Sequence, residues 1–251
     1  MTPDPSRAAP SLRELANRRY QDEAWGPIAL RPGAVSTTRH DDIARLMTDQ
    51  RGRALDFGCG AGQFVIALAD RFDAVVGVDI SDVRIRLADS VLTQRYSQYR
   101  DRVTFLCIDP AAPLPLPDRS FDVVIASAVL EAVPDVFFTL DELARVCRPG
   151  GSLLVSVANV CYIKHVLEML AGQIPVTWSA TRDMGQWRAH GWDGGCLRYF
   201  SQRALRDLLR HTGFEPEQWS GSGSFAKLRR WHPNLCGALT VRARRVARES
   251  S

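Results

Sequence analysis

The stretch LDFGCGAG, residues 55–62, decides the fold class. A short apolar run, Arg53 to Phe57, leads into a turn with glycines at 58, 60 and 62, and a helical pattern starts at Gln63. Glycine permits positive φ angles and lets a ligand approach the backbone closely. A strand, a glycine-rich turn and a helix in this order predict a ligand-binding turn at the carboxyl end of a buried strand.

The alternation of strand and helix continues beyond this turn. Apolar runs at 74–79, 103–108, 121–127 and 152–157 predict strands, and patterns at 63–71, 82–94 and 135–147 predict helices. Strands that are apolar throughout are typical of a parallel sheet covered on both faces, so we expect a doubly wound α/β fold. Two last runs, at about 214–220 and 236–246, predict a hairpin-like end with an antiparallel strand at the sheet edge.

Length and composition fit one α/β domain with additions. The chain has 251 residues, of which 45% are hydrophobic and 24% charged, as in a folded soluble protein. We expect a helical extension over residues 1–50 and the main domain over 51–251, with a substrate-side insertion at about 160–200. The sequence shows no membrane span or secretory signal, and its scattered cysteines suit the cytoplasm and offer no metal site.

Acidic residues mark three consecutive predicted strands. Asp56 lies at the end of the first strand, Asp79 at the end of the second and Asp109 after the third. In open α/β sheets, ligands bind at the carboxyl ends of the strands. A carboxylate at Asp79 can accept hydrogen bonds from both ribose hydroxyls, and one at Asp109 from an adenine amino group. The pattern predicts a nucleoside ligand.

Two details choose between nucleoside ligands. The dinucleotide fingerprint requires a third glycine three residues after the second, where this chain has Gln63. The Asp56 carboxylate would repel a pyrophosphate and attract an ammonium or sulfonium group. These details favour S-adenosylmethionine over NAD.

Four stretches resemble motifs of the class I S-adenosylmethionine-dependent methyltransferases. They are LDFGCGAG (55–62), VGVDIS (76–81), PLPDRSFDVV (115–124) and LARVCRPGG (143–151). The resemblance covers about residues 50–160. It implies a doubly wound, seven-stranded, mostly parallel Rossmann-like sheet with the last strand antiparallel, and S-adenosyl-L-methionine as cofactor.

The same resemblance assigns roles along the sheet edge. It implies that Asp56 and the glycines hold the methionine part of the cofactor, Asp79 the ribose and Asp109 the adenine. The full expected cofactor-binding set consists of Asp56, Gly58, Cys59, Gly60, Gly62, Asp79, Ile80, Asp109, Pro110 and Ser127.

The resemblance implies that the segment after the fourth strand begins the substrate side, where the methyl acceptor binds. Methyl transfer needs chiefly the alignment of nucleophile, methyl carbon and sulfur, and a base only when the nucleophile must lose a proton. His190, in a tryptophan-rich insertion, is the first candidate base because histidine titrates near neutral pH. Tyr199 and Glu131 are the other candidate catalytic residues. Many similar methyltransferases carry a histidine near position 131 or 132, and this chain has none there.

The insertion itself leaves two interpretations open. Residues 191–201, GWDGGCLRYFS, resemble a G-W-D-G-G-H-L-x-Y-F-T stretch of some bacterial methyltransferases, with Cys196 in place of the histidine. The aromatic residues of this region form either a lid over the methyl donor or a small satellite core.

The preferred function is methyl transfer to an oxygen or nitrogen atom of a small-molecule acceptor, with no nucleic acid and with a possible homodimer. One alternative is a non-catalytic partner protein, because residues 167–177 are similar to part of a companion protein in bacterial methionine biosynthesis. A second is an RNA methyltransferase, prompted by the basic C-terminus.

Overall fold

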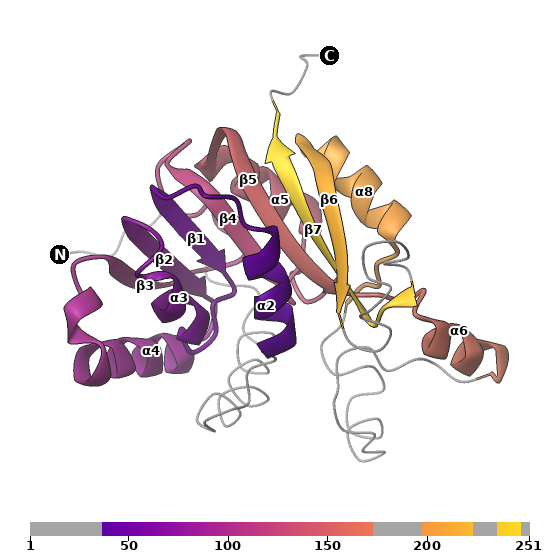
Figure 1. The fold of residues 1–251 in the computed structure, drawn as a ribbon, viewed down its shortest axis with the longest axis horizontal. Helices are drawn as coiled ribbons and strands as arrows, with labels where there is room; N and C mark the ends of the chain where they lie inside the picture. Colours follow the sequence, from indigo (N-terminus) through magenta and orange to yellow (C-terminus); the bar gives the residue numbers. More distant parts are fainter. Residues whose placement is uncertain (1–36, 173–196, 223–234, 247–251) are drawn as a thin grey trace.

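A computed structural model describes residues 37–172, 197–222 and 235–246, and these residues form a seven-stranded sheet with helices on both faces (Figure 1). The strand order is β3-β2-β1-β4-β5-β7-β6. β7 runs antiparallel to β5 and β6, and the remaining pairs are parallel. The predicted sheet is confirmed. The strands are β1 (Arg53–Phe57), β2 (Ala74–Asp79), β3 (Val103–Cys107), β4 (Phe121–Ser127), β5 (Cys147–Ala158), β6 (Phe214–Ser222) and β7 (Ala238–Arg245).

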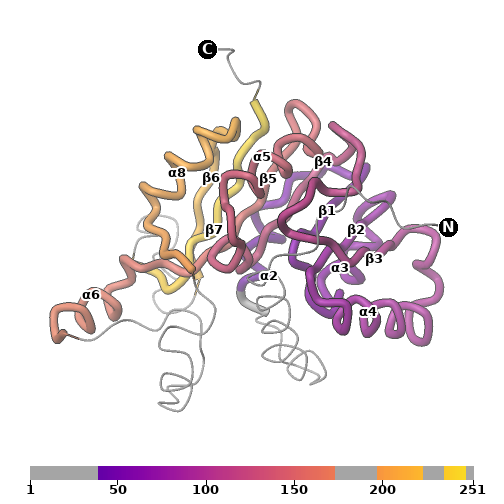
Figure 2. The backbone as a smooth tube through the Cα atoms, turned by 180° about the vertical axis from the view of Figure 1, so that it is seen from behind, coloured from indigo at the N-terminus to yellow at the C-terminus, as the bar shows by residue number. Residues whose placement is uncertain are grey.

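Two layers of helices bury the two faces of the sheet, as Figures 1 and 2 show from opposite sides. One hydrophobic cluster joins the sheet to α2 (Thr37–Leu46), α3 (Gln63–Leu68) and α4 (Asp82–Arg95). The other joins it to α5 (Val136–Val146) and α8 (Gln202–His211). A short 3₁₀ helix covers Ser97–Tyr99, and α6 (Ile163–Leu170) projects to one side (Figure 1). None of the helices in the described ranges is long and apolar enough to cross a membrane.

The position of β7 corrects one prediction. The antiparallel strand was expected at the sheet edge, but β7 lies between β5 and β6, and β6 is the edge strand. The inward side chains of β7, Leu239, Val241 and Ala243, are fully buried and need neighbours on both sides. β6 instead carries Pro216, which has no N–H to donate, beside a register shift, and these features suit an edge.

Polar side chains set the helix starts, as local sequence signals predict. The Ser81 hydroxyl accepts a hydrogen bond from the Arg84 N–H, and the Asp135 carboxylate accepts from the first turn of α5. Ser201 caps α8 in the same way. These caps satisfy N–H groups that lack partners within the helix, and they fix where each helix leaves the sheet edge.

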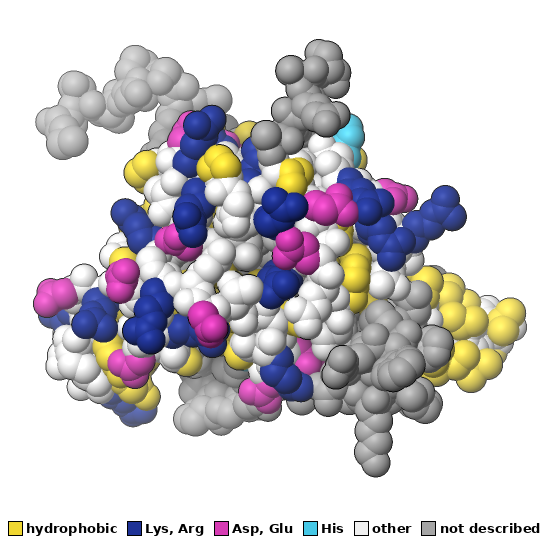
Figure 3. Space-filling view, turned by 45° about the horizontal axis from the view of Figure 1, so that its top comes forward, with side chains coloured by type: hydrophobic (Ala, Val, Ile, Leu, Met, Phe, Trp, Pro, Cys, Tyr) yellow, Lys and Arg dark blue, Asp and Glu magenta, His cyan; other side chains and the backbone are white. Residues whose placement is uncertain are grey.

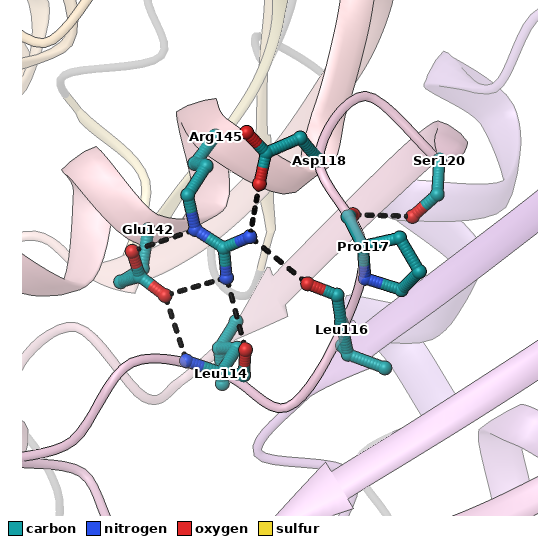
Figure 4. A network of polar contacts seen from close by, with 7 residues as sticks. All are labelled: Leu114, Leu116, Pro117, Asp118, Ser120, Glu142 and Arg145. Carbon is teal, nitrogen blue, oxygen red and sulfur yellow. Dashed lines mark hydrogen bonds and ion pairs between the residues drawn. The ribbon is translucent and has the colours of Figure 1, made fainter.

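Arg145 fixes the proline-rich loop between β3 and β4 (Figure 4). Its guanidinium donates to the carbonyl oxygens of Leu114 and Leu116, each at 2.9 Å. It also pairs with the carboxylates of Glu142 at 2.8 Å and Asp118 at 2.5 Å. The hydrogen bonds from Arg145 hold the pKa of Glu142 below its usual range. The loop that follows β3 is therefore tied to α5.

Replacing this guanidinium should loosen the loop and lower stability. We expect Arg145→Ala to reduce the free energy of unfolding by about 1–2 kcal/mol, because partly buried carbonyl oxygens lose charge-assisted donors. Urea denaturation measures the change. Arg86→Ala is the matched control: its ion pair with Asp82 is exposed, so its effect should stay within about 0.5 kcal/mol. Equal effects of the two variants would contradict this role of Arg145.

Candidate functional site

The glycine turn after β1 exposes its backbone at one position. Gly58, Gly60 and Gly62 have φ angles of 79°, 57° and 78°. A Cβ atom on Gly58 would lie 2.7 Å from the Val129 side chain, and one on Gly62 would lie 2.5 Å from Phe105. A Cβ atom on Gly60 would have no described atom within 4 Å. Two glycines thus serve close packing, whereas Gly60 faces space that a ligand can use.

Asp79 joins the turn to the end of β2. Its Oδ2 atom accepts a hydrogen bond from the Gly60 N–H at 2.8 Å, and its Oδ1 atom accepts from the Ser81 N–H at 2.9 Å. The side chain is buried. A carboxylate oxygen can accept more than one hydrogen bond. Asp79 can therefore hold the turn and still accept hydrogen bonds from a pair of ligand hydroxyls.

Asp56 is a second buried acid beside Asp79. Its side chain is only 4% exposed. Burial, and then the negative charge of Asp79, raise the pKa of Asp56 to about 7. A cationic group beside these acids would favour the charged form of Asp56. The site therefore suits a ligand with a positive charge.

The other expected cofactor residues lie at the same ends of the strands. Cys59 is buried, and burial raises the pKa of its thiol well above the ordinary value, so it is a neutral lining group. Asp109 caps its own turn, because its Oδ1 atom accepts from the Ala111 N–H at 3.0 Å. Half-buried Ile80, Pro110 and Ser127 follow or end β2, β3 and β4.

The end of β4 has an unusual backbone. Ala128, directly after Ser127, has a φ angle of 54°, and its N–H donates to the Ser156 carbonyl oxygen at 2.7 Å. A side chain at this φ is strained by about 1 kcal/mol or more. The strained turn brings Val129 against Gly58. It thereby joins the glycine turn, which is the expected cofactor turn, to the loop that follows β4.

Comparisons with known proteins agree with this geometry. Residues 31–218 match a family model described as a methyltransferase domain. Over 208 residues, the chain is 40% identical to the 27-O-demethylrifamycin SV methyltransferase of Amycolatopsis mediterranei (strain S699), which covers 82% of this chain and 70% of that protein. The chain belongs to the S-adenosylmethionine-dependent methyltransferases.

Two further similarities extend the assignment. The methyltransferase is 37% identical over 118 residues to a demethylmenaquinone methyltransferase of Bacillus licheniformis, spanning 45% of this chain and about half (48%) of that relative. The fold of the present chain is similar to that of geranyl diphosphate C-methyltransferase from Streptomyces coelicolor A3(2), which was solved with S-adenosyl-L-homocysteine. That match has a TM-score of 0.65 at 14% identity and covers 96% of this chain and 100% of the other. S-adenosylmethionine is the cofactor of this family, and the open Gly60 backbone and the paired acids fit it.

The structure describes two of the three predicted catalytic residues of the methyltransferase, Tyr199 and Glu131. His190 lies outside the described residues. Tyr199 is 41% exposed. Glu131 is fully buried, and its Oε1 atom accepts from the Ala158 N–H at 2.7 Å. Burial raises the pKa of Glu131, and the positive charge of Arg39 partly opposes this effect.

Arg198, which lies in the distinctive stretch 191–201, makes contacts that the sequence did not reveal. Its guanidinium donates to the carbonyl oxygens of Leu130 at 3.1 Å, Pro134 at 2.9 Å and Val133. The Leu197 N–H also donates to the Glu131 carbonyl oxygen. These bonds hold residues 197–200 on the loop after β4. Backbone carbonyls leave no sequence signature, so a pattern search could not have found this contact.

The helix α2 supplies two more residues that sequence reasoning missed. The His40 ring stacks on Phe64, in the first turn of α3, with ring centroids 4.2 Å apart. Burial lowers the pKa of His40, which favours the neutral form of the ring. Its neighbour Arg39 acts on Glu131. The helix α2 thus places a positive charge that acts on Glu131 and an aromatic ring that packs on α3.

The raised pKa of Asp56 predicts that cofactor binding depends on pH. If the charged form of Asp56 binds the ammonium group of S-adenosylmethionine, affinity rises as pH increases from 6 to 8, and binding releases a proton. Calorimetry in buffers of different ionisation enthalpy measures the release. Asp56→Asn should bind more weakly and lose this pH dependence. A wild-type affinity that does not change between pH 6 and 8 would contradict the assignment.

The same carboxyl makes a separate prediction for the unliganded protein. A folded-state pKa above the unfolded value stabilises the protein at low pH, and this stability is lost as pH rises from about 4 to about 7. The stability of Asp56→Asn relative to wild type should therefore improve as pH rises from 5 to 8. Thermal unfolding of both proteins across this range tests the sign, and a constant difference would argue against a buried, titrating Asp56.

Proposed function

We propose that this methyltransferase transfers a methyl group to an oxygen or nitrogen atom of a small-molecule acceptor, with a hydroxyl oxygen preferred. The observation that carries the proposal is the contact between the glycine turn and the loop after β4, because this loop also carries a buried carboxyl group, Glu131. The relative that is 40% identical is named for a substrate that lacks an O-methyl group, which supports hydroxyl methylation.

In this proposal the chain's own residues position both reactants. S-adenosylmethionine supplies, when bound, an electrophilic methyl group on a positively charged sulfur. Asp79 would hold the ribose hydroxyls, and Asp56 would attract the ammonium group. The contact between Val129 and Gly58 sets the acceptor loop against the cofactor turn, which favours alignment of the displacement. The Arg198 hydrogen bonds keep that loop in place.

A second candidate function is that of a non-catalytic partner protein, and one observation favours it. The helix α6 leaves a hydrophobic stripe exposed, made of Ile163, Leu167, Met169 and Leu170, with Leu170 80% exposed. Figure 3 shows hydrophobic side chains gathered at the end of the molecule where α6 projects. Exposed stripes of this kind mark protein contacts, either with another enzyme or with a second copy.

RNA methylation is less favoured because the basic C-terminal strand is engaged within the protein. Arg242 and Arg244 both pair with Glu217. Arg245 donates to the carbonyl oxygens of Ala144 and Gly213. Figure 3 shows acidic and basic side chains mixed on the face in view. An RNA site needs an uninterrupted basic face.

The cofactor site is tested by two glycine variants at positions that both have a positive φ angle. Gly60→Ala points a methyl group into the space expected for the cofactor, so we expect at least a tenfold loss of affinity for S-adenosylhomocysteine with a small loss of stability. Gly62→Ala meets Phe105 and Ala88, so its main effect should be on stability. Calorimetry and thermal unfolding separate the two effects. Unchanged affinity in Gly60→Ala would place the cofactor elsewhere.

The acceptor is tested with a defined probe. The purified protein should convert 27-O-demethylrifamycin SV, or a smaller hydroxyl compound from a panel, to a product heavier by one methylene unit, with one S-adenosylhomocysteine formed per product. Mass spectrometry detects both. Tight cofactor binding without methylation of any acceptor in the panel would instead favour the partner-protein function.

A further inference from the structure

One buried oxygen atom in the structure has no hydrogen-bond partner and lies where an acceptor is expected. Glu131 is fully buried, and its Oε1 atom is bonded to the Ala158 N–H, whereas its Oε2 atom is buried without a partner among the described residues. A buried acceptor atom without a donor costs about 1–3 kcal/mol. Such a cost is expected where a ligand supplies the missing donor.

The position of Glu131 relates this atom to the reaction. The strand order reverses between β1 and β4, and ligands of open α/β sheets bind at such a switch point. The cofactor turn follows β1, and Glu131 lies on the loop after β4, two residues beyond the Val129 side chain that packs on Gly58. The Glu131 side chain accepts a hydrogen bond from Ala158, at the end of β5. Glu131 therefore lies on the acceptor side of the switch point.

Two arginines and one histidine come from the elements around Glu131. Arg39 of α2 acts on the carboxyl group, and its charge favours the ionised form. Arg198 packs on the same loop but donates to the backbone carbonyls described above. Across β5, the buried His165 of α6 bonds through Nδ1 to the Asn159 carbonyl oxygen, one residue beyond Ala158. Of these groups, Arg39 is the one whose charge shifts the titration of Glu131.

We propose that the Oε2 atom of Glu131 binds the hydroxyl of the acceptor and takes up its proton during methyl transfer. This inference rests on the proposed function. The acceptor oxygen forms a bond to the methyl carbon, the carbon–sulfur bond breaks with its electron pair on sulfur, and the hydroxyl proton passes to Oε2. A neutral hydroxyl compound, a cationic sulfonium donor and an anionic carboxylate thus become an ether, a neutral thioether and a neutral carboxyl group, so the charges balance.

Two features of Glu131 suit this role. The Oε1 bond to Ala158 fixes the carboxyl group, so Oε2 keeps its position without using its own hydrogen-bonding capacity. Because Oε2 is buried, its partner is buried with it, and the hydroxyl loses its water at the place where it reacts. The hydrogen bonds from Arg198 to backbone carbonyl oxygens also hold the loop that carries Glu131.

The first test needs no acceptor. The pKa of Glu131 is measured by carbon-13 NMR in full-length protein saturated with S-adenosylhomocysteine or with sinefungin, which carries a charged amine near the position of the methylated sulfur. If Oε2 faces the transferred methyl group, the pKa is lower in the sinefungin complex by about one pH unit. Equal pKa values in the two complexes overturn the proposal.

The second test uses Glu131→Gln. The amide oxygen can still accept from Ala158, but the amide nitrogen replaces Oε2 and cannot take a proton. With 27-O-demethylrifamycin SV, or the panel compound that wild type methylates, we expect kcat to fall at least a hundredfold, with an unchanged KM for S-adenosylmethionine. In the wild type, kcat should rise with pH as Glu131 becomes ionised, and this rise should disappear in the variant. Glu217→Gln removes a carboxylate on the distant strand β6 and is the control.

The two tests distinguish failure of this inference from failure of the proposed function. Wild-type turnover that survives in Glu131→Gln overturns the inference and leaves the function intact. A sinefungin-dependent pKa shift without turnover on any hydroxyl compound supports the position of Glu131 and counts against the acceptor class. If the variant does not fold, the NMR comparison on wild type still decides the proximity of Glu131 to the methyl group.

Discussion

The hydrogen bonds of the Asp79 carboxylate hold together the part of the structure on which the rest depends. One oxygen binds the turn after β1 and the other binds the start of α4, so a single side chain sets the distance between two neighbouring strand ends. The N–H groups of Gly58 and Cys59 also donate hydrogen bonds to the carbonyl oxygen of Val78, near the end of β2. The cofactor turn is thereby fixed by β2 before any ligand arrives, which reduces the entropy that binding must overcome.

The two halves of the site are built in different ways. On the cofactor side, short segments carry both the backbone hydrogen bonds and the residues expected to bind the ligand, as in the glycine turn and the loop at Asp79. On the acceptor side, contacts join segments far apart in the sequence: Arg198 holds the loop after β4, and Glu131 reaches the end of β5. Asn159 also donates from its side chain to the Cys236 carbonyl oxygen and so links β5 to the approach to β7. Such a construction lets acceptor specificity change while cofactor binding is retained.

This difference explains what the sequence could predict. The strands, the helix caps and the cofactor turn follow from neighbouring residues, so pattern and motif were sufficient for them. The antiparallel strand β7 was wrongly predicted at the edge instead of between β5 and β6, because strand order depends on which buried side chains need two neighbours. The unpartnered Oε2 of Glu131 and the carbonyls bound by Arg198 depend on geometry across the sheet, and no local pattern encodes them. Likewise, nothing in the N-terminal pattern indicated that His40 would stack on Phe64.

The edge strand β6 constrains how the molecule can associate. Pro216 and the register shift beside it interrupt the row of donors and acceptors that another strand would need, and the neighbouring Glu215 and Glu217 add charge. Growth of the sheet from one subunit into the next is therefore obstructed at this edge, which also protects the protein against fibrillar aggregation. Association with other molecules at this end then involves helices and not strands. The exposed apolar stripe of α6 is a helical surface, so a contact made through it does not extend the β-sheet from one molecule to the next.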